Sequence, residues 1–153
     1  MEAKRNILRM LLIRVMHNVA GTFPFNMVRV AALRCCGYHI GKKAYIGPGL
    51  FIATRAGDPS CRLDIGDRVS IGPRAVLVLA SDANDAAAGK YFPPVRDKII
   101  IGEDTWLGAG VIVMPGVKIG ECSVIGAGAV VNKDIPDNTL AAGVPARAIR
   151  NLG

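Results

Sequence analysis

The sequence is poor in aromatic residues and in histidine. Of its 153 residues, 5% are aromatic, and the two histidines are His17 and His39. Proteins that bind single-stranded nucleic acid commonly stack bases on aromatic side chains, and a three-histidine zinc site needs one histidine more than the chain has. We therefore expect no nucleic-acid partner and no metal site.

Cysteine is also scarce, and no long apolar run occurs. The four cysteines are Cys35, Cys36, Cys61 and Cys122, with no Cys-x-x-Cys among them. Arg9 and Arg14 interrupt the N-terminal apolar stretch, so it does not have the form of a cleavable signal. The uninterrupted run of about 18 apolar residues that would span a bilayer is missing as well. These absences predict free thiols and a cytoplasmic protein, either free or at the inner face of a membrane.

What the sequence does contain is a six-residue repeat. Between Ile101 and Pro136 an aliphatic residue occurs at every sixth position, namely at Ile101, Leu107, Val113, Ile119, Ile125 and Val131. This period fits neither the 3.6 residues of an α-helical turn nor the alternation of an isolated strand. Three units make a coil that stacks Ile101 on Ile119, Leu107 on Ile125, and Val113 on Val131. The repeat therefore predicts a mostly β solenoid of triangular cross-section.

The repeat also defines the organisation of the chain. It begins near residue 37 and is lost from 82 to 98, where the sequence is polar and interrupted by proline. We expect an N-terminal helical cap over residues 1–36 and a β-helix domain over 37–153 with a loop insertion at 82–98. A last partial coil and a basic tail should follow Pro136. Insertions at the corners of a solenoid often carry function.

The N-terminal region predicts two helices, over residues 4–20 and about 25–36. An apolar face of the first contains Ile7, Leu8, Leu11, Leu12, Val15 and Val19. The two helices could cover the open end of the solenoid. They could also contact an anionic membrane, because the first 34 residues hold six basic residues against Glu2 and the chain has a net charge of +7. The two roles are compatible.

Three motifs occur in order in the C-terminal half. They are Trp106-Leu107-Gly108 followed by Pro115-Gly116-Val117, then Asn132-Lys133-Asp134-Ile135-Pro136, and last Ala142-Gly143-Val144-Pro145-Ala146-Arg147. With these motifs, residues 99–150 resemble the hexapeptide-repeat acetyltransferases, most of all the maltose, galactoside and nodulation-type enzymes and those that modify surface polysaccharides. The resemblance implies a left-handed parallel β-helix that forms a homotrimer. It also implies acetyl transfer from acetyl-CoA to a hydroxyl of a sugar or a polysaccharide precursor, at a site between subunits.

The resemblance further implies which residues bind the acyl donor. Ala109 and Ala127 match small positions that let the pantetheine arm approach the backbone, and Trp106 matches a residue beside the transfer site. The phosphate-binding positions are Asn132, Lys133, Arg147 and Arg150, where an ammonium or a guanidinium group suits phosphate oxygens. The alternatives are an ordinary wall position for Trp106 and a solvated tail for the two arginines.

The catalytic position departs from the family pattern. The family has a histidine there, which accepts the proton of the attacking hydroxyl, and this chain has Asp82 in the segment Ala80-Ser81-Asp82-Ala83-Asn84. Aspartate is intrinsically a weaker base than histidine. Three interpretations follow: Asp82 acts as the base, positioned by Asn84; positioning of the substrates suffices; or the chain is an inactive homologue with a binding or structural role. The presence of Lys133, Arg147 and Arg150 favours an enzyme.

Overall fold

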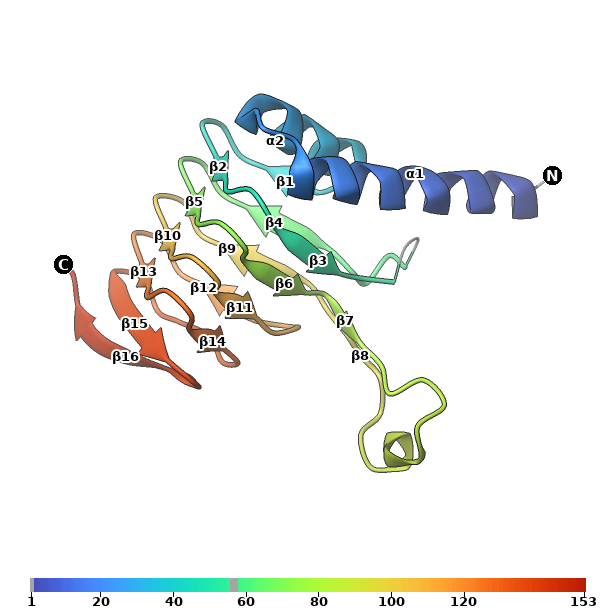
Figure 1. The fold of residues 1–153 in the computed structure, drawn as a ribbon. Helices are drawn as coiled ribbons and strands as arrows, with labels where there is room; N and C mark the ends of the chain where they lie inside the picture. The colour runs from blue at the N-terminus through green and yellow to red at the C-terminus, as the bar shows by residue number, and fades with distance from the viewer. Residues whose placement is uncertain (1, 56–57) are drawn as a thin grey trace.

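The computed structural model describes residues 2–55 and 58–153, with side chains from Ile7 onward, and it shows a three-sided parallel β-helix with two helices at its N-terminal end (Figure 1). Wall A contains β1 (His39–Ile40), β4 (Leu63–Ile65), β9 (Ile99–Ile101) and β12 (Lys118–Ile119). Wall B contains β2 (Tyr45–Ile46), β5 (Ser70–Ile71), β10 (Trp106–Leu107), β13 (Val124–Ile125), β15 (Thr139–Gly143) and β16 (Ala146–Asn151). Wall C contains β3 (Phe51–Ala53), β6 (Val76–Val78), β11 (Ile112–Val113) and β14 (Val130–Val131).

The register predicted from the repeat is confirmed. Ile101 lies opposite Ile119, Leu107 opposite Ile125, and Val113 opposite Val131. All six side chains are buried, and together with the earlier coils they form one aliphatic core. Fully burying a side chain of this kind contributes about 1.5–3 kcal/mol, so the stacked columns dominate the stability of the coil.

Glycine follows many of the buried aliphatic residues because successive coils touch at the corners. A Cβ added to Gly108 would lie 2.6 Å from the backbone nitrogen of Ala127 in the next coil. Real Cβ atoms do not approach a backbone so closely, and the neighbouring coil cannot move without breaking the register. The Gly in the repeat is therefore a packing requirement of the solenoid.

A ladder of buried hydroxyl groups links the coils at the corner between walls A and B. The hydroxyl of Thr105 donates to the carbonyl of Gly120 (2.7 Å) and accepts from the backbone N–H of Ser123 (3.2 Å). The Ser123 hydroxyl repeats the pattern one coil later, donating to the carbonyl of Pro136 (2.8 Å) and accepting from the N–H of Thr139 (3.1 Å). Burying these polar groups does not lower the stability of the coil, because each of them has a hydrogen-bond partner.

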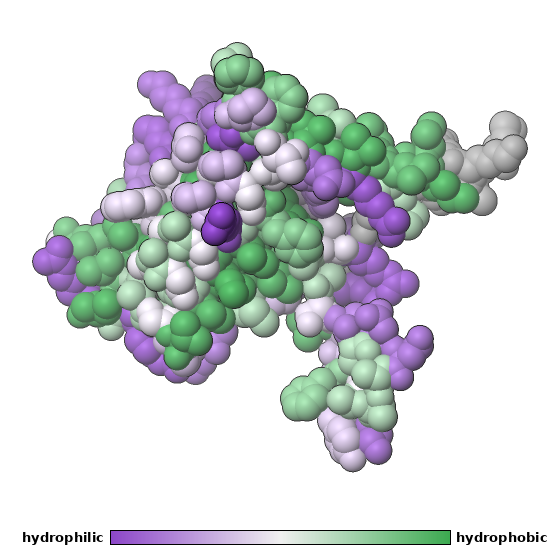
Figure 2. Space-filling model, viewed as in Figure 1, coloured by the Kyte–Doolittle hydropathy of each residue, from purple (hydrophilic) through white to green (hydrophobic). Residues whose placement is uncertain are grey.

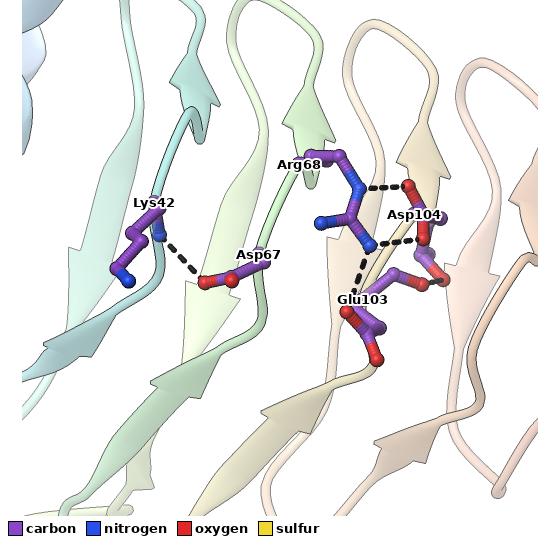
Figure 3. A network of polar contacts seen from close by, with 6 residues as sticks. Lys42, Asp67, Arg68, Glu103 and Asp104 are labelled. Atoms are coloured by element: carbon purple, nitrogen blue, oxygen red, sulfur yellow. Dashed lines mark hydrogen bonds and ion pairs between the residues drawn. The ribbon is translucent and has the colours of Figure 1, made fainter.

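The outer surface of the same corner holds a network of polar contacts between coils (Figure 3). The guanidinium group of Arg68 donates to both carboxylate oxygens of Asp104, at 2.6 Å each, and to Glu103 at 2.8 Å. These hydrogen bonds hold the pKa of Asp104 below its usual range. One coil earlier the backbone N–H of Lys42 donates to Asp67 (2.7 Å). Since Arg68 pairs with carboxylates of the next coil and Asp67 accepts from the backbone of the preceding one, these contacts link three successive coils.

Helix α2 (Asn26–Cys35) closes the first coil, as predicted for the cap, and packs against β1 and β2. The guanidinium group of Arg29 is buried and donates to three backbone carbonyls, among them that of Ile46 at 2.7 Å. Arg34 donates to the carbonyls of Ile40 and Gly41. Two of the six N-terminal basic residues therefore hold the cap on the coil.

Helix α1 (Glu2–Thr22) packs through a different face from the one that the sequence indicated. Its buried side chains are Ile13 and Ala20, with Met16 and Val19 partly buried. Five residues of the predicted apolar face are 50–69% exposed: Ile7, Leu8, Leu11, Leu12 and Val15. The reason is visible in Figures 1 and 2, where the N-terminal part of α1 extends beyond the coil and its apolar side chains are in solvent. Among the described residues, no helix has the length and apolar character needed to cross a membrane.

The predicted loop is an arm with a short ladder at its base. Its stem is formed by β7 (Ala80–Ser81) and β8 (Val95–Arg96), which pair antiparallel, and a 3-10 turn (Ala87–Lys90) lies near the tip. The arm leaves the corner between walls C and A and projects away from the coil (Figure 1). It begins two residues earlier than the repeat indicated, because Ala80 pairs with Arg96.

The C-terminus differs from the expected basic tail. Strand β15 joins wall B parallel to β13, and β16 turns back and pairs antiparallel with β15. The turn uses Gly143, whose φ is +101°, a conformation that glycine adopts without strain. Arg147 and Arg150 therefore lie on a strand at the edge of wall B.

Candidate functional site

The corner between walls B and C presents a column of small residues. Ala109 and Ala127 follow one another in this column, and the N–H of Gly128 donates to the carbonyl of Ala109 at 2.8 Å. Both alanines are exposed. A hollow of about 670 Å³ runs along the corner, lined by Pro48, Gly49, Pro73, Arg74, Ala109 and Gly110. The structure thus places the two predicted small positions in adjacent coils, and Ala109 lines a space that a thin chain can occupy.

Arg74 is a residue of this corner that the sequence analysis did not single out. It has a left-handed backbone, with φ of +59°, at the position that Gly110 and Gly128 occupy in later coils. A non-glycine residue in this conformation is uncommon. Among the described residues its guanidinium group has no hydrogen bond or ion pair. The signal in the sequence was an arginine at a glycine position of the repeat.

Trp106 and the two C-terminal arginines lie on wall B. Trp106 pairs with Ser70 on one side and Val124 on the other, and its side chain is 56% exposed. The same row continues from Val124 through Leu140 to Arg150. Both Arg147 and Arg150 are exposed, so two cations lie at the C-terminal end of this wall.

Asn132 and Lys133 lie at a different corner. They follow β14, where the chain turns from wall C to wall A, and both are exposed. This is also the corner from which the arm leaves. Strand β14 therefore joins the corner of Ala127 to the corner of Lys133.

Asp82 is the centre of a small polar network at the base of the arm. Its carboxylate forms ion pairs with Arg96 at 3.4 Å and Arg55 at 4.0 Å, and it accepts a hydrogen bond from the backbone N–H of Asn84 at 2.9 Å. Arg96 also pairs with Asp58 at 3.6 Å. Asn84 thus orients Asp82 through its backbone, and φ of +48° at Asn84 accompanies this turn. Arg96 belongs to β8 of the arm itself, whereas Arg55 follows β3 and no pattern in the sequence pointed to it.

The two histidines have local environments unlike that of Asp82. The Nε2 atom of His17 lies 3.0 Å from the hydroxyl of Tyr38, and the two rings are stacked with centroids 5.6 Å apart. Burial lowers the pKa of His17. His39 is exposed on β1. Within residues 2–55 and 58–153, no cluster of three or more metal-ligating side chains is found, and the four cysteines are free.

Within one chain, the predicted site residues therefore lie in two separate groups. Trp106, the small-residue column and the two C-terminal arginines lie on wall B and at its corner with wall C. Asp82, Asn84, Asn132 and Lys133 lie at the corner between walls C and A, so the width of wall C separates the two groups.

Comparisons with known proteins agree with this architecture. Residues 98–133 match the sequence model of the bacterial transferase hexapeptide family (six repeats). The chain is 40% identical over 115 residues to the galactoside O-acetyltransferase of Lactococcus lactis, covering 73% of this chain and 55% of the relative. It is 40% identical over 114 residues to the galactoside O-acetyltransferase of Escherichia coli, covering 74% and 54%. The chain spans about half the length of the curated relatives that it matches.

Solved structures share the fold over almost the whole chain. A maltose O-acetyltransferase from Clostridium difficile superposes with a TM-score of 0.66 at 29% identity, covering 99% of this chain and 88% of that one. A hexapeptide-repeat acetyltransferase from Vibrio cholerae, complexed with acetyl coenzyme A, superposes with a TM-score of 0.72 at 27% identity, covering 96% and 88%.

The repeat and the three-walled coil define a hexapeptide-repeat protein with the left-handed parallel β-helix fold. The resemblance of the chain to the acetyltransferases of the hexapeptide-repeat family is confirmed.

Proposed function

We propose that this protein is an acetyl-CoA-dependent O-acetyltransferase that acts on a hydroxyl of a sugar or of a surface-polysaccharide precursor. The observation that carries the proposal is the exposed column of Ala109 and Ala127, together with the hollow of about 670 Å³ that Ala109 lines at the same corner. A pantetheine arm is thin and has amide groups, so it needs a narrow path beside accessible backbone. Galactoside and maltose O-acetyltransferases among the relatives support the reaction class.

The phosphates of the donor would bind to the cations near this path. Arg147 and Arg150 lie on the edge strand of wall B, beyond the coil that holds Ala127. Their guanidinium groups match phosphate oxygens in geometry and charge. Lys133 and Asn132 would contribute from the other corner.

We place the complete site between copies of the chain in a homotrimer. The separation of the two residue groups by wall C supports this arrangement, since the corner of Ala109 in one subunit can face the arm and Asp82 of the next. The arm supports it as well: near its tip, Tyr91 and Phe92 are 71% and 74% exposed. Large aromatic side chains gain stability when a neighbouring surface covers them, and a second copy provides that surface.

In the proposed reaction the acceptor hydroxyl attacks the acetyl carbonyl carbon. The new C–O bond forms, the C–S bond breaks, and the thiolate leaves. The carboxylate of Asp82 accepts the hydroxyl proton and passes it to the departing sulfur, so no covalent enzyme intermediate is needed. Holding the two substrates in line contributes further to the rate.

A specific observation favours a second candidate function. The carboxylate of Asp82 is engaged by Arg96 and Arg55, and a base whose lone pairs are occupied by cations is a poor proton acceptor. A homologue that binds acetyl-CoA or a partner without catalysis, or that has a structural role, is consistent with this pairing. The two functions differ in whether substitution of Asp82 changes turnover.

Binding of acetyl-CoA tests the donor site independently of catalysis. We expect saturable binding by isothermal titration calorimetry, and at least about tenfold weaker binding for Arg150→Gln and for Lys133→Gln, because a hydrogen bond to a charged group contributes about 1.5–3 kcal/mol. Lys42→Gln is the matched control, since it removes one positive charge from the corner between walls A and B. Absence of binding at millimolar acetyl-CoA would contradict the transferase proposal.

We also propose that the exposed face of α1 contacts an anionic bilayer. Ile7, Leu8, Leu11, Leu12 and Val15 are exposed apolar residues on one side of α1, and no other described residue covers them. Figure 2 shows apolar surface along this helix. Arg9 and Arg14 lie on the same helix and have no hydrogen bond or ion pair through their side chains within the described part of the chain. A helix with apolar and basic residues lies in the interface of an anionic membrane, whereas a second copy of this face would bring arginines together. Contact of this kind suits work at the inner face of a membrane.

Vesicle flotation tests the membrane contact. We expect the protein to float with vesicles of phosphatidylcholine and phosphatidylglycerol, less so in high salt, and not with phosphatidylcholine alone. The double substitution Leu8→Glu and Leu11→Glu should abolish flotation, whereas Met27→Glu, at an 83% exposed position on α2, should not. Should the double variant instead change the oligomer mass in solution, the face is an interface between copies.

A further inference from the structure

A second hollow, of about 360 Å³, lies between α1 and the segment that follows β3. Three arginines line it: Arg9 on α1, Arg55 just after β3, and Arg62 just before β4. Tyr38, Thr54 and Cys61 are also among its lining residues. Burial raises the pKa of Tyr38 to about 12, so its hydroxyl stays protonated. We call this space the arginine hollow.

Within the described part of the chain, Arg55 pairs with Asp82, but the other two arginines of the hollow have no acidic partner. Its one lining carboxylate is Asp58, which accepts from the hydroxyl and the N–H of Ser60, at 2.6 and 3.0 Å, and pairs with Arg96 outside the hollow. The hydrogen bonds from Ser60 hold the pKa of Asp58 below its usual range. Among the described residues, neither Arg9 nor Arg62 has a side-chain hydrogen bond or an ion pair. The hollow therefore carries an excess of positive charge directed at an open space.

The arginine hollow adjoins the candidate catalytic position. Arg55 lines the hollow and also lies 4.0 Å from the carboxylate of Asp82. Asp58 is connected to the same carboxylate through Arg96. A molecule anchored in the hollow would thus extend toward Asp82.

We propose that the arginine hollow binds a phosphoryl group of the acceptor, so that the substrate class is a phosphorylated sugar and not a neutral one. Guanidinium groups bind phosphate oxygens through paired, charge-assisted hydrogen bonds. The acceptor role rests on the proposed function, whereas phosphoryl binding by the hollow does not. The phosphate can belong to a soluble sugar phosphate or to a lipid-linked one, and Arg9 comes from the helix whose outer face is proposed to contact lipid.

The test is calorimetric titration with glucose 1-phosphate and, separately, with glucose. We expect saturable binding of glucose 1-phosphate only, weakened at least about tenfold in Arg62→Gln and in Arg9→Gln and lost in the double variant. Lys42→Gln, with the same change in net charge, should bind as the unchanged protein does. Thermal unfolding of each variant verifies that it is folded.

Three outcomes separate the possibilities. If the unchanged protein binds vesicles containing phosphatidic acid but not glucose 1-phosphate, and Arg62→Gln loses that binding, the phosphoryl group belongs to a lipid-linked acceptor. The proposal is overturned if Arg62→Gln binds glucose 1-phosphate and the phosphatidic acid vesicles as well as the unchanged protein does. Titration with acetyl-CoA distinguishes the donor site: unchanged affinity in Arg62→Gln is expected, and weaker affinity would assign the hollow to the donor. If the unchanged protein does not bind acetyl-CoA, the proposed function is overturned, whereas the proposal that the hollow binds a phosphoryl group is unaffected.

Discussion

Asp82→Ala is expected to lower kcat for acetyl transfer from acetyl-CoA to a sugar acceptor by about 10²–10⁴-fold, the range that a positioned general base contributes. Affinity for acetyl-CoA should stay the same, because Asp82 lies at the base of the arm and the small-residue column lies at another corner. The measurement is initial rate against acceptor and donor concentration, over a panel of neutral and phosphorylated sugars.

Two further substitutions separate proton transfer from the ion pairs that Asp82 makes. Asp82→Asn keeps an oxygen that can accept from the N–H of Asn84 but removes the base, so it should be as slow as Asp82→Ala. Arg96→Gln breaks the same ion pair at 3.4 Å but leaves the carboxylate. It should keep most of the activity, because it frees the base instead of removing it. If Asp82→Ala retains full activity, Asp82 is not the base and positioning alone accounts for transfer.

Asp82→His provides the complementary test, as it introduces the residue that the family resemblance implies at this position. We expect a rate above that of the unchanged protein and a new pH dependence, rising with pH through the range around 6.5 where an imidazole loses its proton. No gain over Asp82→Ala would mean that the site geometry differs from that of the family.

Gly108→Ala is expected to lower the free energy of unfolding by about 1–3 kcal/mol, as overpacking in a closely packed interior does. The added Cβ would lie 2.6 Å from the nitrogen of Ala127 and 3.0 Å from the carbonyl oxygen of Ile125, both backbone atoms of the next coil. Because Ala127 belongs to the proposed donor path, weaker binding of acetyl-CoA should accompany the loss of stability. Denaturant unfolding at fixed protein concentration measures the first effect, and titration measures the second.

Gly89→Ala is the control for this substitution. Its Cβ would lie 3.3 Å from the side-chain Cβ of Ala83 in the arm, where no coil-to-coil contact exists. Its stability should change by less than about 0.5 kcal/mol, as is usual for surface positions. Equal effects of the two substitutions would show that the corners are less closely packed than the structure indicates.

The coil could be predicted from the sequence because residues at short, fixed spacing define it. Each coil repeats three six-residue units, so the positions of Ile101, Leu107 and Val113 define their partners one coil later by counting. The count also holds across the arm, since Leu77 lies opposite Val113. An insertion at a corner does not change which residue faces the interior, and the repeat therefore predicted both the register and the place where the arm leaves.

The packing of the N-terminal helix could not be predicted by counting residues. The spacing of Leu8, Leu11 and Val15 indicated an apolar face, and the structure contains that face. The helix packs on the coil through Ile13 and Ala20 instead. Which face of a helix is covered depends on how far the neighbouring surface reaches. The coil ends before the N-terminal part of α1, so the more apolar strip has nothing to pack against.

The sequence by itself determined the triangular coil, its register, the cap and the family resemblance, because each depends on residues at fixed short spacing. Only the tertiary structure decided which residues share a corner. It separated Ala109 and Ala127 from Asp82 and Lys133 by a wall, and it brought Arg55 and Arg96 to Asp82 from different segments. It also placed Arg9 of the helix beside Arg62 of the coil. Such contacts join parts of the chain whose separation follows no period, so they arise only when the coil, the arm and the helix are packed together.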